Sequence, residues 1–340
     1  MPFLHLPNEI IISISHHQSP PDIYALCRAN RRLSALLIPE LLKSVSARRG
    51  DTSSVRVLLK HGITKLLGDT FLHEAVRTEG EIAIKTLLDS GGFNATSTNA
   101  KGRAPLCLAV SDGQPAVVGL LLQCPGADVN PRSTGTRWPL VARAAHRGNE
   151  KIMRLLLANE RLLVNATDLV GVTALTRAAL EGRPEIASLL LADPRTDINH
   201  RDMWGRTPLL TSCVVGHFAV FKLLLEDPRT EVNAADREGQ TPLHCCAERH
   251  RSHMVRPLLA HPRIDVNRRD ISLCTPLFAA VAGQNTEVAR ILVADARVNV
   301  NTTGEFGQHP LVVAAEKGLS DVAEMLLQRE DLNFCALNCN

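Results

Sequence analysis

Residue types that bind metals or act as catalytic bases gather at three places in the sequence. His73-Glu74 matches the start of a zinc-protease motif, but Arg77 stands where the second metal-binding histidine is needed. Cys335 and Cys339 are spaced like half of a metal site, and no second half accompanies them. Neither place therefore predicts a metal-dependent reaction.

The third place is a run of potential zinc ligands comprising His244, Cys245, Cys246, His250 and His253. His244 belongs to a phrase that recurs along the chain, and the two cysteines occupy positions that other copies fill with small residues. We therefore interpret His244 as a structural histidine and the cysteines as reduced core thiols. Nucleophile-elbow, P-loop and dinucleotide-binding glycine motifs are absent. The sequence predicts a protein that is not an enzyme and uses neither a metal nor another cofactor.

The recurring phrase reads Thr-Pro-Leu in its clearest copies, which begin at Thr207, Thr241 and Thr275. With looser copies, successive starts are 34 or 35 residues apart and fall near residues 70, 104, 138, 173, 207, 241, 275 and 309. A fixed period of this length is the signature of a solenoid built from stacked repeats. The architecture follows from this period before any single element is assigned.

One copy illustrates the helices that we expect in each repeat. Thr207 suits a helix N-cap and Pro208 suits the first helical position. Gly216 is expected to end the first helix, and residues 218–225 to form a second helix whose leucines face the stack. Asn233 then enters the turn between copies.

Some copies depart from the phrase or extend it. Ala104, Trp138 and His309 stand where the capping threonine is expected, and for the alanine this costs about 0.5–2 kcal/mol of helix stability. After the second helix, three copies carry Asp193-Pro194-Arg195, Asp227-Pro228-Arg229 and His261-Pro262-Arg263. We expect this stretch to hold the residue that lengthens the common 33-residue repeat.

The phrase, its period and its glycines resemble ankyrin repeats. The resemblance implies an all-α solenoid of helix-turn-helix repeats with connecting hairpin turns over residues 46–340, beginning with a degenerate unit. It also implies that the turn tips and the exposed side of each first helix line a concave protein-binding face. The residues predicted to contact a target on this face are Arg201, Met203, Trp204, Arg206, Arg237, Glu238, Glu248, Arg249, Arg269 and Ile271.

Within this set we expect Trp204 to be the anchor, because tryptophan and arginine are enriched at interface hot spots. At a turn tip, the Trp204 side chain has no obvious hydrophobic core to pack into. The alternative is that Trp204 packs sideways against the neighbouring tip. Leu169 and Phe306 extend the predicted surface at other tips.

Residues 1–45 do not repeat. Leu6-Pro7 and Glu9-Ile10, followed by an Asp22-Ile23 step, resemble the F-box motif, which docks on the Skp-type adaptor of a cullin-RING ubiquitin ligase. By this resemblance the adaptor-binding residues are Leu6, Pro7, Ile10, Ile11, Ile14, Ile23, Leu26, Cys27 and Leu33. The alternative is a small helical cap that only covers the first repeat.

The charge and the apolar stretches of the sequence exclude two classes of partner, nucleic acids and membranes. The net charge of +3 comes from residues 1–50, where six lysines and arginines face three acidic residues. The rest of the chain is balanced, so no basic stripe for nucleic acid is expected. No apolar stretch reaches the roughly 18 residues of a membrane span. We predict a monomeric cytoplasmic or nuclear adaptor protein that recruits a protein target to the ligase. The alternative is a plain ankyrin scaffold without a ligase link.

Overall fold

The computed structural model describes residues 71–78, 81–89, 94–99, 102–131, 138–304 and 307–333. These residues form sixteen α-helices and no strand. They divide into two compact units, Met1–Leu163 and Val164–Asn340, which are considered separately below. The F-box-like segment 1–45 and the degenerate first repeat lie outside the described residues.

In Met1–Leu163 the described helices form three successive pairs. Within each pair the first helix packs against the second, and each helix also packs against its counterpart in the next pair. The pairs are α6 (Phe71–Thr78) with α7 (Glu81–Asp89), α8 (Pro105–Asp112) with α9 (Pro115–Gln123), and α10 (Leu140–Arg147) with α11 (Glu150–Leu157).

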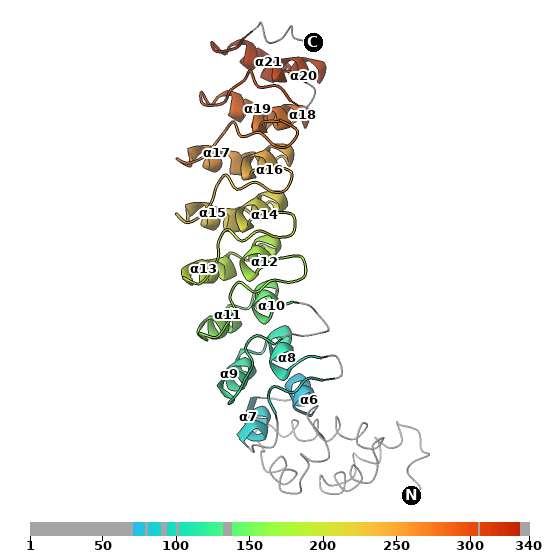
Figure 1. The fold of residues 1–340 in the computed structure, drawn as a ribbon, viewed down its shortest axis with the longest axis vertical. Coiled ribbons are helices and arrows are strands. Elements are labelled where there is room, and N and C mark those ends of the chain that lie inside the picture. The colour runs from blue at the N-terminus through green and yellow to red at the C-terminus, as the bar shows by residue number, and fades with distance from the viewer. Residues whose placement is uncertain are drawn as a thin grey trace, which may run out of the picture. The chain divides into compact units, whose positions relative to one another are not determined.

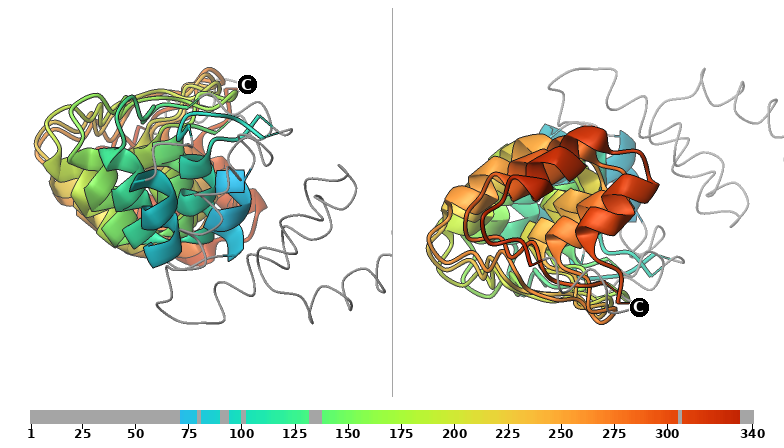
Figure 2. Two further views of the ribbon diagram at one scale, coloured as in Figure 1. Left: turned by 90° about the horizontal axis from the view of Figure 1, so that it is seen from below. Right: turned by 90° about the horizontal axis from the view of Figure 1, so that it is seen from above.

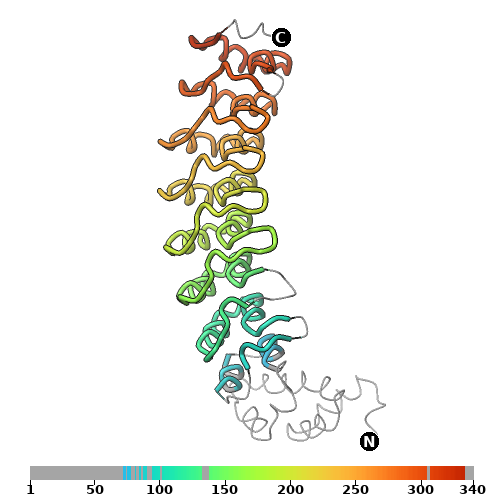
Figure 3. The backbone as a smooth tube through the Cα atoms, viewed as in Figure 1, coloured from blue at the N-terminus to red at the C-terminus, as the bar shows by residue number. Residues whose placement is uncertain are grey.

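In Val164–Asn340 five further pairs continue the same pattern, with the first helices in one row and the second helices in another (Figure 1). The backbone tube shows the same helix-turn-helix path repeated from pair to pair (Figure 3). The first helices are α12 (Ala174–Glu181), α14 (Pro208–Val215), α16 (Pro242–Glu248), α18 (Pro276–Ala282) and α20 (Pro310–Glu316). The second helices are α13 (Pro184–Ala192), α15 (Phe218–Glu226), α17 (Ser252–Ala260), α19 (Thr286–Val293) and α21 (Ser320–Leu327).

The predicted start and end of the first helix are confirmed at α14. The Leu210 N–H donates to the Thr207 hydroxyl oxygen at 3.3 Å, and Pro208 occupies the first turn. Gly216 ends the helix with φ 90°, a left-handed conformation that glycine adopts without steric cost. Thr173, Thr241 and Thr275 cap their helices in the same way. The repeat phrase is therefore a helix-start signal.

Two repeats that lack the capping threonine begin their first helix in ways that the sequence does not show. The N-cap of α10 is Pro139, one residue after Trp138, which the repeat phrase aligns with the capping threonine. His309 does not forfeit the cap, because its Nδ1 accepts a hydrogen bond from the Leu311 N–H at 3.2 Å. Burial lowers the pKa of His309, which keeps the ring neutral and able to accept. Ala104 makes no side-chain cap, as expected.

The second helices supply most of the largest fully buried side chains. In α15, Val220, Phe221 and Leu224 have no exposed surface. This helix packs against α13, α14 and α17, so its leucine face lies between neighbouring repeats as predicted. The core consists mainly of interfaces between adjacent pairs, which is how a solenoid is stabilised.

Asparagines of the connecting segments link each repeat to the next. The Asn233 side chain donates to the Arg263 carbonyl at 2.7 Å and accepts from the Asp265 N–H at 2.9 Å. The same pair of bonds recurs at Asn130, Asn165, Asn199, Asn267 and Asn301. In Val164–Asn340 the connecting segments gather on one side of the helices (Figure 2). These bonds set the spacing of the segments that carry the hairpin turns.

Candidate protein-interaction surface

Four successive hairpin turns in Val164–Asn340 are each shaped by an aspartate at the first position. The Asp202 carboxylate accepts hydrogen bonds from the N–H groups of Trp204 and Arg206, both at 2.9 Å. Asp168 and Asp236 make the same two bonds within their turns. The Asp270 carboxylate accepts a hydrogen bond from the Cys274 N–H at 2.9 Å. The carboxylates fix the loops locally, so the intervening side chains are not needed to hold them.

Backbone hydrogen bonds join these turns into a ladder. The Met203 N–H donates to the Val170 carbonyl at 2.9 Å, and the Arg237 N–H donates to the Trp204 carbonyl at 2.9 Å. The Ile271 N–H continues the ladder to the Glu238 carbonyl at 3.0 Å. We call the turns 168–172, 202–206, 236–240 and 270–274 the hairpin ridge. Because the turns are hydrogen-bonded to one another, the ridge presents its side chains at a fixed spacing.

Most of the predicted target-contacting residues are exposed and lie on the ridge or directly before one of its turns. Met203 and Trp204 are each 44% exposed, and Ile271 is 71% exposed. Arg201, Arg237, Glu238 and Arg269 are also exposed, whereas Arg206 is half-buried. Leu169, at the first tip, is 64% exposed. Large apolar side chains that face solvent at one rigid edge are typical of a binding surface. Their role in target recognition remains a prediction.

Trp204 makes a side-chain contact within its own turn. The Arg206 guanidinium carbon lies 5.2 Å from the centre of the Trp204 ring, within the range of a cation–π contact. The Trp204 N–H donates to the Asp202 carboxylate, and the Trp204 carbonyl accepts from the Arg237 N–H. The ring is thus in contact with its own turn, while 44% of the residue is exposed.

The arginines that the sequence placed at successive tips occupy two different positions. Arg201 and Arg269 each precede the turn aspartate, whereas Arg237 follows it. The Arg201 guanidinium donates to the Ala235 carbonyl of the next connecting segment and therefore bridges two repeats. The three cations are not one evenly spaced row.

Glu248 and Arg249 extend the surface onto the end of α16. The side-chain amide of Gln240 donates to a Glu248 carboxylate oxygen at 2.5 Å, which ties this helix end to its own hairpin turn. Partial burial raises the pKa of Glu248 above its ordinary value, and the bond from Gln240 opposes that shift. Arg249 is the exposed C-cap of the helix. The helix end and the 236–240 turn thus form one continuous surface.

Leu273 belongs to the ridge but is not singled out by the sequence. Its side chain is 54% exposed, and its φ of 63° lies in the left-handed region. The other three turns carry glycine at this position, and a Cβ on Gly239 would approach the Ile271 nitrogen to 2.9 Å. A bulky residue in this conformation is an outlier whose backbone strain must be sustained by the surrounding structure. The sequence shows an aliphatic residue at this position, whereas the exposure and the positive φ of Leu273 are visible only in the structure.

The histidine and cysteine run is part of the fold. His244 is fully buried, its Nδ1 accepts from the Thr241 N–H at 3.2 Å, and its Nε2 donates to the Cys274 carbonyl at 3.1 Å. Burial lowers the pKa of His244 and raises the pKa of the Cys245 thiol, so both stay neutral. The structural interpretation of His244 is confirmed. Within the described ranges no three histidine, cysteine or acidic residues are arranged to hold a metal ion.

The other candidate histidine plays a similar part in its own repeat. Nε2 of His73 lies 2.7 Å from the Arg103 carbonyl oxygen, which corresponds to the bond between His244 and Cys274. Several residues considered in the sequence analysis lie outside the residues that the structure describes. These are Phe306, Cys335, Cys339 and the adaptor-binding set Leu6, Pro7, Ile10, Ile11, Ile14, Ile23, Leu26, Cys27 and Leu33.

Comparison with known protein families gives one match. A family model for three copies of ankyrin repeats matches residues 43–133, 132–202, 194–270 and 271–335, which is most of the chain. The chain belongs to the ankyrin-repeat family. It is therefore a protein–protein interaction module, and ankyrin-repeat proteins are typically non-catalytic scaffolds. A search of curated proteins finds no significant match. In the described ankyrin repeats, no helix has the length and apolar character to span a membrane.

Proposed function

We propose that this ankyrin-repeat protein is a substrate-recognition subunit of a cullin-RING ubiquitin ligase. In this proposal the hairpin ridge binds a protein target, and residues 1–45 dock on a Skp-type adaptor. A tethered target would be held at high effective concentration near the ubiquitin-loading enzyme, without chemistry by this chain. We further propose that the protein is monomeric apart from this complex and acts in the cytoplasm or nucleus.

The observation that carries target binding is the exposed apolar ridge held on a hydrogen-bonded ladder. Met203, Trp204 and Ile271 expose apolar surface that the repeat stack does not need for its own packing. A preformed surface loses little conformational entropy on binding, which favours affinity. The adaptor link is supported only by the resemblance of Leu6-Pro7 and the following residues to an F-box. Without that link, the chain would act as a plain ankyrin scaffold.

Replacing Trp204 with alanine should weaken target binding about thirtyfold, equivalent to roughly 2 kcal/mol. The melting midpoint should stay near that of the parent, because the half-exposed ring contributes little to the core. The target is first identified by crosslinking and proteomics with the full chain, and its affinity is then measured by calorimetry.

Leu327→Ala is the matched control, since Leu327 is an equally exposed apolar residue on α21, away from the ridge. It should bind like the parent. If Trp204→Ala lost stability and kept affinity, Trp204 would be a packing residue and the ridge would not be the recognition surface.

A further inference from the structure

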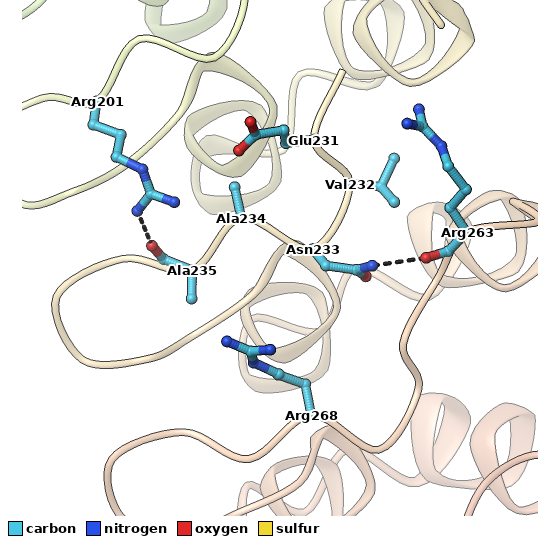
Figure 4. Close-up of a pocket in the computed structure, with 8 residues that line it drawn as sticks. All are labelled: Arg201, Glu231, Val232, Asn233, Ala234, Ala235, Arg263 and Arg268. Atoms are coloured by element: carbon cyan, nitrogen blue, oxygen red, sulfur yellow. Dashed lines mark hydrogen bonds between the residues drawn. The ribbon is translucent and has the colours of Figure 1, made fainter. Parts of the chain in front are cut away.

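A hollow of about 530 Å³ opens between successive connecting segments behind the hairpin ridge. Its floor is the segment from Glu231 to Ala235, and its basic lining residues are Arg201, Arg263 and Arg268 (Figure 4). Glu231 is the single acidic residue of this lining. Three arginines and one glutamate thus line the hollow, which gives its lining a net positive charge.

Arg263 lacks a partner that its counterparts have. Arg195, Arg229 and Arg297 are each paired with the aspartate two residues earlier, at 2.6, 2.7 and 2.7 Å. In the repeat of Arg263 that aspartate is replaced by His261. The Arg263 guanidinium instead donates to the neutral carbonyls of Pro228 and Thr230, both at 3.0 Å. Its position is fixed by these bonds while its charge is not neutralised.

The two other cations reach the hollow from the neighbouring segments. Arg201 is held by its bond to the Ala235 carbonyl, and Arg268 is exposed on the segment that leads into the 270–274 turn. Among the described residues, none of Arg201, Arg263 and Arg268 forms a salt bridge with a carboxylate. Guanidinium groups bind carboxylates through paired, directional hydrogen bonds. The hollow therefore suits an acidic side chain supplied from outside.

Apolar side chains stand next to this charge. Ile271 is 71% exposed and Leu273 is 54% exposed, and both follow Arg268 on one turn. Leu273 adopts φ 63° where the other turns use glycine, so the turn bears both backbone strain and exposed apolar surface. Much of the surface of both side chains is left uncovered in the described fold. A partner that covers both leucine and isoleucine would offset the exposure.

We propose that the hollow and the 270–274 turn form one subsite for an acidic peptide segment of the target that carries an aliphatic residue beside its carboxylates. The carboxylates lie against Arg201, Arg263 and Arg268, and the aliphatic side chain packs on Ile271 and Leu273. A nucleic-acid strand fits less well, because successive bases need successive aromatic platforms and the hairpin ridge offers one aromatic side chain, Trp204. The subsite rests on the proposed target recognition but not on the adaptor link.

The test is selection of a random peptide display library on the full chain, followed by fluorescence anisotropy with the best binder. We expect recovered peptides to be enriched in aspartate and glutamate next to leucine, isoleucine or valine. Arg268→Ala and Arg263→Ala should each weaken binding about tenfold or more, and added salt should weaken binding by the parent. Arg268 is exposed on a connecting segment, so its variant should fold normally.

Two further variants separate the subsite from general effects of charge and folding. Arg229→Ala removes a guanidinium already paired with Asp227 and should leave peptide affinity unchanged. Leu273→Gly should weaken binding several-fold while the melting midpoint stays equal or rises, because glycine tolerates the positive φ.

Failure of this subsite is distinguishable from failure of target recognition. Peptides that lack acidic residues, no recovered binder, or equal losses for Arg229→Ala and Arg263→Ala would each overturn the subsite. Displacement of the peptide by single-stranded DNA with equal affinity would also overturn it. If Trp204→Ala still weakened capture of the intact target in that case, the proposed recognition by the ridge would stand.

Discussion

Leu224→Ala should lower the free energy of unfolding by about 2–5 kcal/mol. Leu224 has no exposed surface in α15, which packs against helices of its own repeat and of both neighbours. Truncation removes transfer free energy and leaves a cavity that neighbouring helices fill only in part. Urea denaturation followed by far-UV circular dichroism measures the change. Because repeats are coupled mainly to their neighbours, the loss should be concentrated in the transition that includes α13 to α17.

Leu327→Ala provides the comparison for this variant, because the same residue type is half-exposed on another second helix. It should shift the denaturation midpoint far less. A Leu224→Ala midpoint equal to that of the parent would contradict the assignment of the second helices as the interior of the stack.

Replacing Leu6 and Pro7 together with alanine should abolish co-purification with a Skp-type adaptor. In the proposed function these residues belong to the apolar edge by which the F-box-like segment docks. The circular dichroism of the repeats should remain nearly unchanged, because the substitutions lie outside residues 46–340. Trp204→Ala, placed on the target surface, should retain adaptor binding. Undiminished binding by the double variant, or no binding by the parent, would remove the ligase link.

The elements set by local chemistry could be predicted from the sequence. Thr207, Pro208 and Gly216 each act through their own backbone or cap, so their roles follow from residue type and period. The sequence predicts a turn at Asn233, but its two bonds to the next repeat depend on how the connecting segments stack. The period and the caps define the repeat in the sequence, whereas the contacts between repeats can be seen only in the folded structure.

Two helix caps differ from the repeat phrase for specific reasons. Trp138-Pro139-Leu140 imitates the Thr-Pro-Leu phrase, yet the cap falls on Pro139, one residue later. His309 is not among the usual capping residues, and only its geometry shows that a neutral ring nitrogen accepts from Leu311. Sequence matching assigns a position in the phrase, but the first helical residue is decided by the backbone.

The candidate surface was partly visible in the sequence. Trp204, Met203 and Ile271 could be placed at turn tips because the turns follow the aspartates of the repeat. Leu273 could not, since an aliphatic residue gives no sign of a left-handed backbone. The replacement of aspartate by His261 is legible in the sequence, but the convergence of Arg263 with Arg201 and Arg268 on one hollow arises only from stacking.

Hydrogen exchange of the full chain, with and without its identified target, tests the central claim most directly. The account predicts that target binding slows exchange of backbone amides in residues 202–206, 236–240 and 270–274. Exchange in the second helices α13, α15, α17 and α19 should change little, because these helices lie in the other row of the stack. Protection confined to those helices, with the hairpin ridge unchanged, would contradict recognition through the ridge.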